Sequence, residues 1–543
     1  MKKNDLLTLK IEGMGNEGEG IGKADGFPLF IKDALPGDVI RAKALKVKKT
    51  YGYGRLMEIV TASPDRTEPP CPVHRSCGGC QIQALSYEKQ LEYKREKVQN
   101  QLIRIGGFSD PEVLPVLGMD EPFRYRNKAQ FPFGRDREGR VVTGFYAGRT
   151  HHIVPNRDCL LGVAENQEIL EILVDFMEQE GIAPYEEASG EGLVRHVLIR
   201  KGFATGELMV CLVLNGDVLP GAGELADRLF QIPGMTSFTL NVNTKNTNVI
   251  LGDKLIPVRG QAYITDRIGD VQYRISPLSF YQVNPVQTKR LYETALSYAG
   301  LTGTEVVWDL YCGIGTISLF LAQKAGRVYG VEVVPQAVED ARENAALNGL
   351  SNVEFYLGKA EEVLPRQYEE KGIRADVIVV DPPRKGCGQA CLDTILSMAP
   401  ERIVYVSCDS ATMARDLKLL CEGGYELKKV QPVDMFPHTA GIETCVLLSQ
   451  RHIDDYIRVS VELTPEDVTP AEAKATYDMI KKYVLENYKT KVSSLYIAQI
   501  KRKYGLETGE SYNKPKCEKP KVPKCPADKE RMIVAALKYY KML

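Results

Sequence analysis

Several features that would at once assign a protein to a class are missing from this chain of 543 residues. No apolar run approaches the roughly 20 residues needed to span a bilayer, and the opening residues MKKNDLLTLKIEG lack the hydrophobic segment of a signal peptide. The net charge is only −1, so the chain as a whole is no polycation. We expect a cytoplasmic, monomeric protein with no membrane partner, built from about three to five domains.

Cysteine, in contrast, is abundant, with 13 residues. In a reducing compartment these residues are thiols, metal ligands or nucleophiles rather than structural disulfides. One of them, Cys408, ends the β-branched run RIVYVSC and precedes a helix-like segment. A cysteine that serves only as a small buried hydrophobe is the alternative. The position at the end of a strand favours a nucleophile.

Turn signals and hydrophobic periodicity divide this multidomain chain into five parts. Short runs separated by glycines predict an N-terminal β-barrel, and the stretch GNEGEGIGKADGFPLFIKDALPGDVI resembles a TRAM domain, an OB-like RNA-binding barrel. Strands that alternate with helices predict a doubly wound, parallel α/β sheet further on. The parts are 1–62, the barrel; 63–119, a cysteine-rich segment and linking helix; 120–270, a central α+β domain for RNA recognition; 271–450, the α/β sheet; and 451–543, a basic helical extension of unknown role.

A glycine loop marks the expected cofactor site. In VVWDLYCGIGTISLFLA, a strand leads through Gly313 and Gly315 into a helix, so the backbone can approach a ligand closely. The spacing is not the G-x-G-x-x-G of dinucleotide sites. Glu332 ends the next strand, where a carboxylate can accept hydrogen bonds from ribose hydroxyls, and Asp381 opens D-P-P after a later strand. Together these motifs resemble class I S-adenosylmethionine methyltransferases.

The Cys408 thiol at the end of its strand indicates which atom receives the methyl group. Methyl transfer to an amine or hydroxyl group needs only a base and alignment, whereas methyl transfer to carbon 5 of uracil needs a nucleophile. Carbon 5 of uracil is a weak nucleophile, and attack of a thiolate on carbon 6 activates it. A base must afterwards remove the proton from carbon 5. Glu443 begins the last predicted strand, ETCVLLSQ, and is our candidate base. An exocyclic-amine N-methyltransferase is a rival, but Arg384 stands after the two prolines where that motif usually has an aromatic residue.

At this point the sequence resembles the RNA 5-methyluridine methyltransferase family over about residues 5–450, specifically the bacterial 23S rRNA (uracil-5-)-methyltransferases with a TRAM domain. The resemblance implies Cys408 as nucleophile, Glu443 as base and Phe280 near the target uridine. It also implies that S-adenosylmethionine is contacted by Gln282, Tyr311, Glu332 and Asp381. A tRNA uracil-5-methyltransferase and a non-catalytic RNA-binding or chaperone protein are the alternatives; the barrel and the cysteines favour rRNA over tRNA.

Two positions depart from the family pattern. Gly441 stands where a second histidine is common in the motif before the base, and Thr316 stands where asparagine is frequent. Neither change removes a catalytic group, so we expect an active enzyme.

Four further cysteines form the expected metal site. Cys71, Cys77 and Cys80 are closely spaced, and Cys159 resembles the fourth ligand of the family. Four thiolates fit a 4Fe-4S cluster, with zinc as the alternative. The basic, tyrosine-containing segment 41–55 and the segment FRYRNKAQFPFGR (123–135) are candidate RNA contacts.

Overall fold

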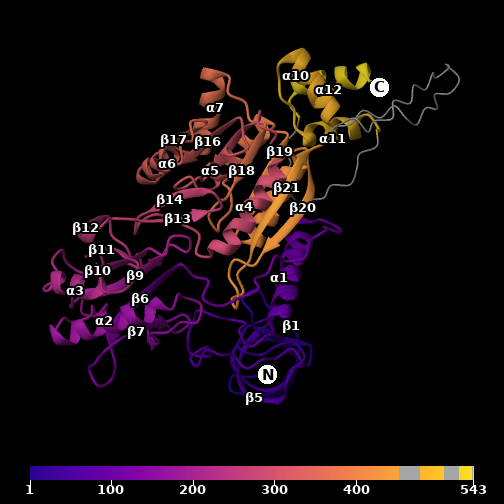
Figure 1. Cartoon of the computed structure of the whole chain (residues 1–543). Helices are drawn as coiled ribbons and strands as arrows, with labels where there is room; N and C mark the ends of the chain where they lie inside the picture. Colours follow the sequence, from indigo (N-terminus) through magenta and orange to yellow (C-terminus); the bar gives the residue numbers. More distant parts are fainter. Residues whose placement is uncertain (452–476, 507–524, 541) are drawn as a thin grey trace. The chain divides into compact units, whose positions relative to one another are not determined.

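The computed structural model describes residues 1–451, 477–506, 525–540 and 542–543. The chain divides into two compact units, Met1–His452 and Ile453–Leu543, and each is described by itself (Figure 1). No helix of the described residues is both long and apolar enough to cross a membrane.

The N-terminal segment forms the predicted barrel. Its strands close in the order β1-β2-β3-β5-β4, and alternate residues such as Leu9, Ile11 and Ile31 fill the interior. Gly20 is required where two chain segments meet, because a Cβ atom there would lie 2.5 Å from the carbonyl oxygen of Ala34. The strands are β1 (Leu6–Met14), β2 (Gly20–Ala24), β3 (Phe27–Ile31), β4 (Val39–Val47) and β5 (Gly52–Thr61).

The cysteine-rich segment leads into the linking helix α1 (Tyr87–Gln101), which continues as the short π-helix η1 (Leu102–Gly106). A central sheet follows. The sheet has seven strands in the order β12-β11-β10-β9-β6-β7-β8. Its middle strands are buried on both faces, and α2 and α3 share a core cluster with them. The elements are β6 (Lys128–Arg135), β7 (Val141–Tyr146), β8 (Ile153–Pro155), α2 (Glu165–Gln179), β9 (Val194–Lys201), β10 (Leu208–Leu214), α3 (Ala222–Leu229), β11 (Met235–Val242) and β12 (Lys254–Gly260).

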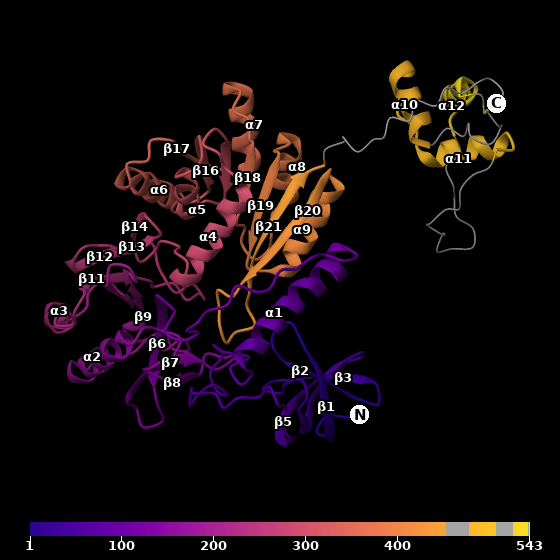
Figure 2. The ribbon, with the colours of Figure 1, turned by 45° about the vertical axis from the view of Figure 1, so that its right-hand side comes forward.

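The third part is an α/β sheet of seven strands in the order β17-β16-β15-β18-β19-β21-β20, preceded by the hairpin β13-β14. Helices cover both faces (Figure 2), and a separate apolar cluster fills each side. The elements are β13 (Ile264–Ile268), β14 (Val271–Ile275), α4 (Pro285–Ala299), β15 (Val306–Leu310), α5 (Thr316–Ala322), β16 (Arg327–Glu332), α6 (Pro335–Leu347), β17 (Val353–Leu357), α7 (Ala360–Lys371), β18 (Val377–Val380), α8 (Gln389–Met398), β19 (Arg402–Ser407), α9 (Ser410–Glu422), β20 (Tyr425–Val433) and β21 (Glu443–Gln450).

The predicted parallel order of this sheet is wrong at one edge. The strand β21 pairs antiparallel with both β19 and β20, and β20 was missing from the predicted strands. A short loop joins β20 to β21, so these two strands form a hairpin and cannot be parallel. The reversal matters, because it places the first residue of β21 at the edge where the parallel strands end.

The second unit contains three described helices: α10 (Tyr477–Tyr488), α11 (Ser494–Lys503) and α12 (Ala527–Tyr539). They enclose an apolar cluster of their own, which includes Val484, Ile497, Ile533 and Leu537. The helices agree with the predicted helical extension. The proline-rich stretch YNKPKCEKPKVPKCP (512–526) lies mostly outside the described residues.

Candidate active site

The structure brings Cys408 and Glu443 to the same end of the α/β sheet. In the ladder between β19 and β21 the last residue pair is Ser407 with Thr444. One further step along that antiparallel register sets Cys408 opposite Glu443. Side chains of directly opposed residues point to the same face and their Cβ atoms lie about 4.5–5.5 Å apart. Sequence reasoning placed both residues at strand ends but could not show that the ends are neighbours.

The Glu443 carboxyl group is buried and incompletely satisfied. The residue is 3% exposed, and its Oε2 atom has no hydrogen-bond partner among the described residues. Burial and the nearby Asp381 raise its pKa well above the usual range, while Arg384 acts in the opposite direction. Such a carboxyl group accepts a proton strongly once it is ionised, and the Arg384 charge favours that ionised form.

The Cys408 thiol is half-buried directly after β19. Burial, Glu443 and Asp381 raise its pKa to about 11, whereas Arg384 and a backbone hydrogen bond favour the thiolate. The next residue, Asp409, caps α9 by accepting hydrogen bonds from the backbone N–H groups of Ala411 and Thr412, at 3.0 and 2.9 Å. The cap fixes the turn that carries the thiol.

Glu332 is held by the glycine loop that it faces. The backbone N–H of Gly313 donates to its Oε2 atom at 3.0 Å, and Val333 and Val334 donate to Oε1 at 2.7 and 2.9 Å. These bonds fix the carboxylate at the end of β16. Each oxygen keeps a lone pair that can accept a ribose hydroxyl.

Tyr311 adopts a left-handed backbone conformation, with φ at 69°. Such a conformation is uncommon for a bulky residue and often marks a functional turn. Here it turns the chain from β15 into the loop that carries Gly313, and the Tyr311 N–H donates to the carbonyl of Val331 at 3.0 Å. The sequence carries no signal for this conformation.

Asp309, on β15 just before the loop, opens the motif D-L-Y-C-G-I-G-T, but the sequence argument gave it no role. Its carboxyl group is fully buried, accepts a hydrogen bond from the Ser318 hydroxyl at 2.5 Å, and leaves Oδ1 without a partner among the described residues. Burial raises its pKa to about 7, opposed by the Ser318 bond, and the charges of Asp381 and Glu332 add to the rise. Desolvation alone raises the pKa of Asp381 to about 6.

The strand ends therefore gather four carboxyl groups: Asp309, Glu332, Asp381 and Glu443. Loss of solvation raises the pKa of Asp309, Asp381 and Glu443, and Asp309 and Glu443 each keep one oxygen without a hydrogen-bond partner among the described residues. Such a crevice disfavours the anionic phosphates of a dinucleotide and favours a cation. S-adenosylmethionine carries a positive sulfur and an ammonium group, so the residues present fit this cofactor.

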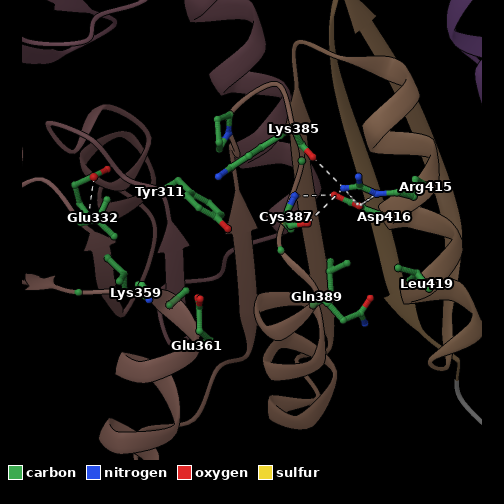
Figure 3. A pocket seen from close by; sticks show the side chains of 18 residues that line it. Tyr311, Glu332, Lys359, Glu361, Lys385, Cys387, Gln389, Arg415, Asp416 and Leu419 are labelled. Atoms are coloured by element: carbon green, nitrogen blue, oxygen red, sulfur yellow. Dashed lines mark hydrogen bonds and ion pairs between the residues drawn. The ribbon is translucent and has the colours of Figure 1, made fainter.

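A cleft of about 730 Å³ opens beside these strand ends. Figure 3 shows Tyr311 and Glu332 on one side of it and Arg415 and Asp416 on the other. The Asp416 carboxylate accepts the Cys387 N–H at 2.8 Å and so fixes the loop after D-P-P. Two of the predicted cofactor residues thus line this cleft.

Gln282 lies in the loop between β14 and α4. It is 6% exposed, and its backbone carbonyl accepts the side-chain amide of Asn127 at 2.9 Å. Phe280, two residues earlier, is 67% exposed. An aromatic ring that remains in solvent beside a buried glutamine suits a partner with stacking faces.

The loop that leads into Glu443 is anchored by the linking helix α1. No sequence motif predicted this contact. Lys94 on α1 is fully buried and its Nζ atom lies 2.5 Å from the Asp434 carboxylate and 3.0 Å from the Phe436 carbonyl. The His438 N–H donates to the Gln90 side chain at 3.0 Å. Helix α1 therefore sets the path of the chain towards the candidate base.

The two departures from the family pattern are both accommodated. A Cβ atom on Gly441 would lie 3.1 Å from the Phe436 ring, so the ring occupies the side of the loop where the common histidine would begin. The Thr316 hydroxyl hydrogen-bonds the buried Tyr292 hydroxyl at 2.8 Å. Neither position touches Cys408 or Glu443 through a described hydrogen bond.

The four predicted metal-ligating cysteines are free thiols: Cys71, Cys77, Cys80 and Cys159. Among the described residues, no group of three or more His, Cys, Asp or Glu side chains is arranged to hold a metal ion. The thiols nevertheless act on one another: burial raises the pKa of Cys80 to about 12, and charges on the other three add to the rise. A bridge between Cys77 and Ala147 ties the cysteine loop to the central sheet.

The fold and the site define an S-adenosylmethionine-dependent methyltransferase. A family model described as tRNA (Uracil-5-)-methyltransferase matches residues 235–451, and a TRAM domain model matches residues 2–57. A relative from Halalkalibacterium halodurans, named as an RNA methyltransferase, is 52% identical and covers 83% of this chain and 98% of its own. One from Bacillus cereus is 50% identical with the same coverage.

A solved structure supports the same assignment. The tRNA (uracil-54, C5)-methyltransferase of Pyrococcus abyssi, in complex with S-adenosyl-L-homocysteine, is 30% identical with a TM-score of 0.67, and the match covers 81% of this chain and 99% of that one. The chain belongs to the RNA uracil-5-methyltransferase family. It is an enzyme that methylates RNA with S-adenosylmethionine.

Proposed function

We propose that this enzyme methylates carbon 5 of a uridine in 23S rRNA, with Cys408 as nucleophile and Glu443 as base. The observation that carries the proposal is the antiparallel register that sets these two residues opposite each other at the cofactor end of the sheet. We further propose that Gln282, Tyr311, Glu332 and Asp381 contact the cofactor and that Phe280 lies near the uridine. The division of the first unit into barrel (1–62), cysteine segment (63–119), central domain (120–270) and catalytic domain (271–450) stays part of the proposal.

The reaction proceeds in three steps. The Cys408 thiolate attacks carbon 6 of the uracil, and the new carbon–sulfur bond makes carbon 5 nucleophilic. When bound, S-adenosylmethionine supplies a methyl group on a positively charged sulfur, and carbon 5 takes this group. Glu443 then removes the proton from carbon 5, the electron pair re-forms the ring double bond, and the bond to sulfur breaks. The thiolate is regenerated.

The residues around the two groups suit these roles. Arg384, which favours ionisation of both Cys408 and Glu443, is exposed next to them. The buried environment of Glu443 strengthens it as a proton acceptor late in the reaction. The target base must leave its stack to reach the thiol.

The barrel offers a surface for the RNA. The closed barrel carries a cluster of aromatic rings on β3 and at the start of β5, in which Phe30 lies 5.7 Å from Tyr51 and 6.0 Å from Tyr53 between ring centroids. The Lys48 ammonium group lies 4.8 Å from the centroid of the Tyr51 ring. Rings next to cations suit stacked bases and phosphates. In the segment 123–135, by contrast, Arg124 is paired with Asp158 and Asn127 is buried.

The experiment that tests the chemistry compares Cys408→Ala with Glu443→Gln. Cys408→Ala should abolish methyl transfer while binding of S-adenosylmethionine persists. Glu443→Gln should accumulate a methylated RNA–protein adduct that resists denaturation, because the proton on carbon 5 is not removed. Normal turnover by either variant would contradict the mechanism.

Transfer RNA is a second candidate substrate, and the Pyrococcus abyssi structure favours it. That tRNA enzyme matches over most of this chain, so the barrel and the overall length do not separate the two substrates as the sequence argument assumed. Mapping 5-methyluridine in rRNA and tRNA from a strain that lacks this gene decides between them. A missing modification in tRNA alone would overturn the rRNA assignment.

We also propose that Cys71, Cys77, Cys80 and Cys159 hold a 4Fe-4S cluster, with zinc as the alternative. The proposal rests on the sequence resemblance of the four cysteines, because no three of them are arranged to hold a metal ion among the described residues. A cluster there would hold the cysteine loop against the central sheet and takes no part in methyl transfer.

A further inference from the structure

The second unit lies beyond the part of the chain that the family accounts for. The methyltransferase model ends at residue 451. The Halalkalibacterium halodurans relative is covered over 98% of its length by 83% of this chain, and the remainder of this chain matches the second unit in size. The extension is therefore an addition to an enzyme that is already complete.

The addition is a folded module with its own interior. Helices α10, α11 and α12 pack around Ile480, Ile500 and Ile533, each at most 3% exposed. The Ser493 hydroxyl accepts a hydrogen bond from the Tyr496 N–H at 3.3 Å and starts α11. A core of this kind presents a fixed outer surface.

The charge of this surface is opposite to that of the remaining chain. The described residues 477–506, 525–540 and 542–543 contain ten lysine or arginine and four aspartate or glutamate residues, a net charge of +6. The whole chain carries −1. Four exposed cations have no ion pair to a carboxylate among the described residues: Lys489, Lys491, Arg531 and Lys538.

An exposed tyrosine stands next to a lysine at the end of each of the three described helices. Tyr488 ends α10 and precedes Lys489, Tyr504 follows Lys503 at the end of α11, and Tyr539 follows Lys538 at the end of α12. Their exposures are 42%, 45% and 65%. The Tyr539 ring also packs against Tyr483, with ring centroids 4.7 Å apart, whereas no ring contact within the described residues holds Tyr488 or Tyr504.

We propose that the second unit is an additional RNA-binding module, which holds substrate RNA outside the catalytic site through phosphate contacts and stacking on the exposed tyrosines. Lysines neutralise phosphates, and tyrosine rings stack on unpaired bases. The inference rests on the RNA substrate of the family and is independent of the chemistry proposed for Cys408 and Glu443.

The test uses the full-length chain with Lys489→Glu, Lys491→Glu and Lys538→Glu combined. Loss of three phosphate contacts should lower the slope of log affinity against log salt by about 2 to 3 and weaken binding about 10- to 100-fold at low salt. The probes are a 23S rRNA transcript and a short oligouridine, measured with Cys408→Ala protein so that no turnover is needed. In the catalytically intact chain, KM for RNA should rise while kcat is unchanged.

Two matched variants separate the contributions. The corresponding lysine-to-arginine triple variant keeps the charge and should bind like the parent chain. Tyr488→Ala with Tyr539→Ala should weaken oligouridine binding and leave the salt slope unchanged. An unaltered salt slope in the glutamate variant, or a preference of the full-length parent chain for duplex DNA over both RNA probes, would overturn the proposal.

Discussion

Removal of the Lys94 charge should destabilise the first unit strongly. Lys94 and Asp434 are both fully buried and 340 residues apart in sequence, and their charged atoms lie 2.5 Å from each other. Burial lowers the pKa of Lys94, opposed by Asp434. In Lys94→Met the Asp434 carboxylate stays buried with only the Tyr87 hydroxyl, at 2.9 Å, as a described side-chain partner. Breaking one side of a buried pair costs about 3–5 kcal/mol.

The single tryptophan provides the assay. Trp308 is fully buried in β15 and stacks on Tyr329 with ring centroids 4.9 Å apart, so its fluorescence follows urea unfolding of the α/β sheet. Lys89→Met is the matched control, because Lys89 lies on the same helix in an exposed pair with Glu92, worth less than about 1 kcal/mol. Asp434→Asn added to Lys94→Met should recover more than half of the loss. Equal urea midpoints for Lys94→Met and Lys89→Met would refute the reasoning.

Two further predictions concern a buried histidine and the cysteines. The pKa of His438 is lowered from 6.5 to about 4 by burial and by Lys94, so the unfolded chain binds the proton first; stability is full above pH 6.5 and falls by about 3 kcal/mol as the pH drops to 4. His438→Gln should flatten that part of the curve of urea midpoint against pH, and an unchanged curve would argue against a neutral buried imidazole. Protein purified without oxygen should be brown, with four iron and four sulfide per chain if a 4Fe-4S cluster is bound; colourless protein that contains zinc would refute the cluster.

The positions of the catalytic candidates followed from local patterns. A β-branched run with an abrupt polar end predicts a buried strand, and carboxyl ends of parallel strands share one edge. This is why Cys408, Glu332 and Asp381 were assigned from sequence to the end of the sheet where they are found. Glu443 lies there for another reason, since its strand runs in the opposite direction and begins where the others end.

What escaped prediction depends on contacts between distant segments or on rare backbone conformations. No periodicity in α1 reveals that Lys94 meets Asp434, because a buried lysine and a surface lysine look alike in sequence. Nor does a motif reveal that Tyr311 has a positive φ. The partnerless Oδ1 of Asp309 belongs to the same class. These features carry the electrostatics of the site.

Because burial and the carboxyl groups at the strand ends raise the pKa of Cys408, the reactivity of its thiol should depend on the charge of the bound cofactor. With its pKa at about 11, only about one thiol in ten thousand is ionised at pH 7. A cation within about 4–6 Å lowers such a pKa by about 1–3 units. S-adenosylmethionine is positive at sulfur, whereas S-adenosyl-L-homocysteine has nearly the same shape and a neutral sulfur. Iodoacetamide should therefore alkylate Cys408 at least about 10-fold faster with the first ligand than with the second.

Cys421 is the internal control for this comparison. It is half-buried near the end of α9, and burial raises its pKa to about 11 as well. Its neighbours include none of the four carboxyl groups of the crevice, so its rate should be the same with either ligand. Both rates follow from one digest by mass spectrometry of the two cysteine peptides. Equal alkylation of Cys408 with the two ligands, or a parallel change at Cys421, would show that the carboxyl-rich strand ends do not couple cofactor charge to the nucleophile.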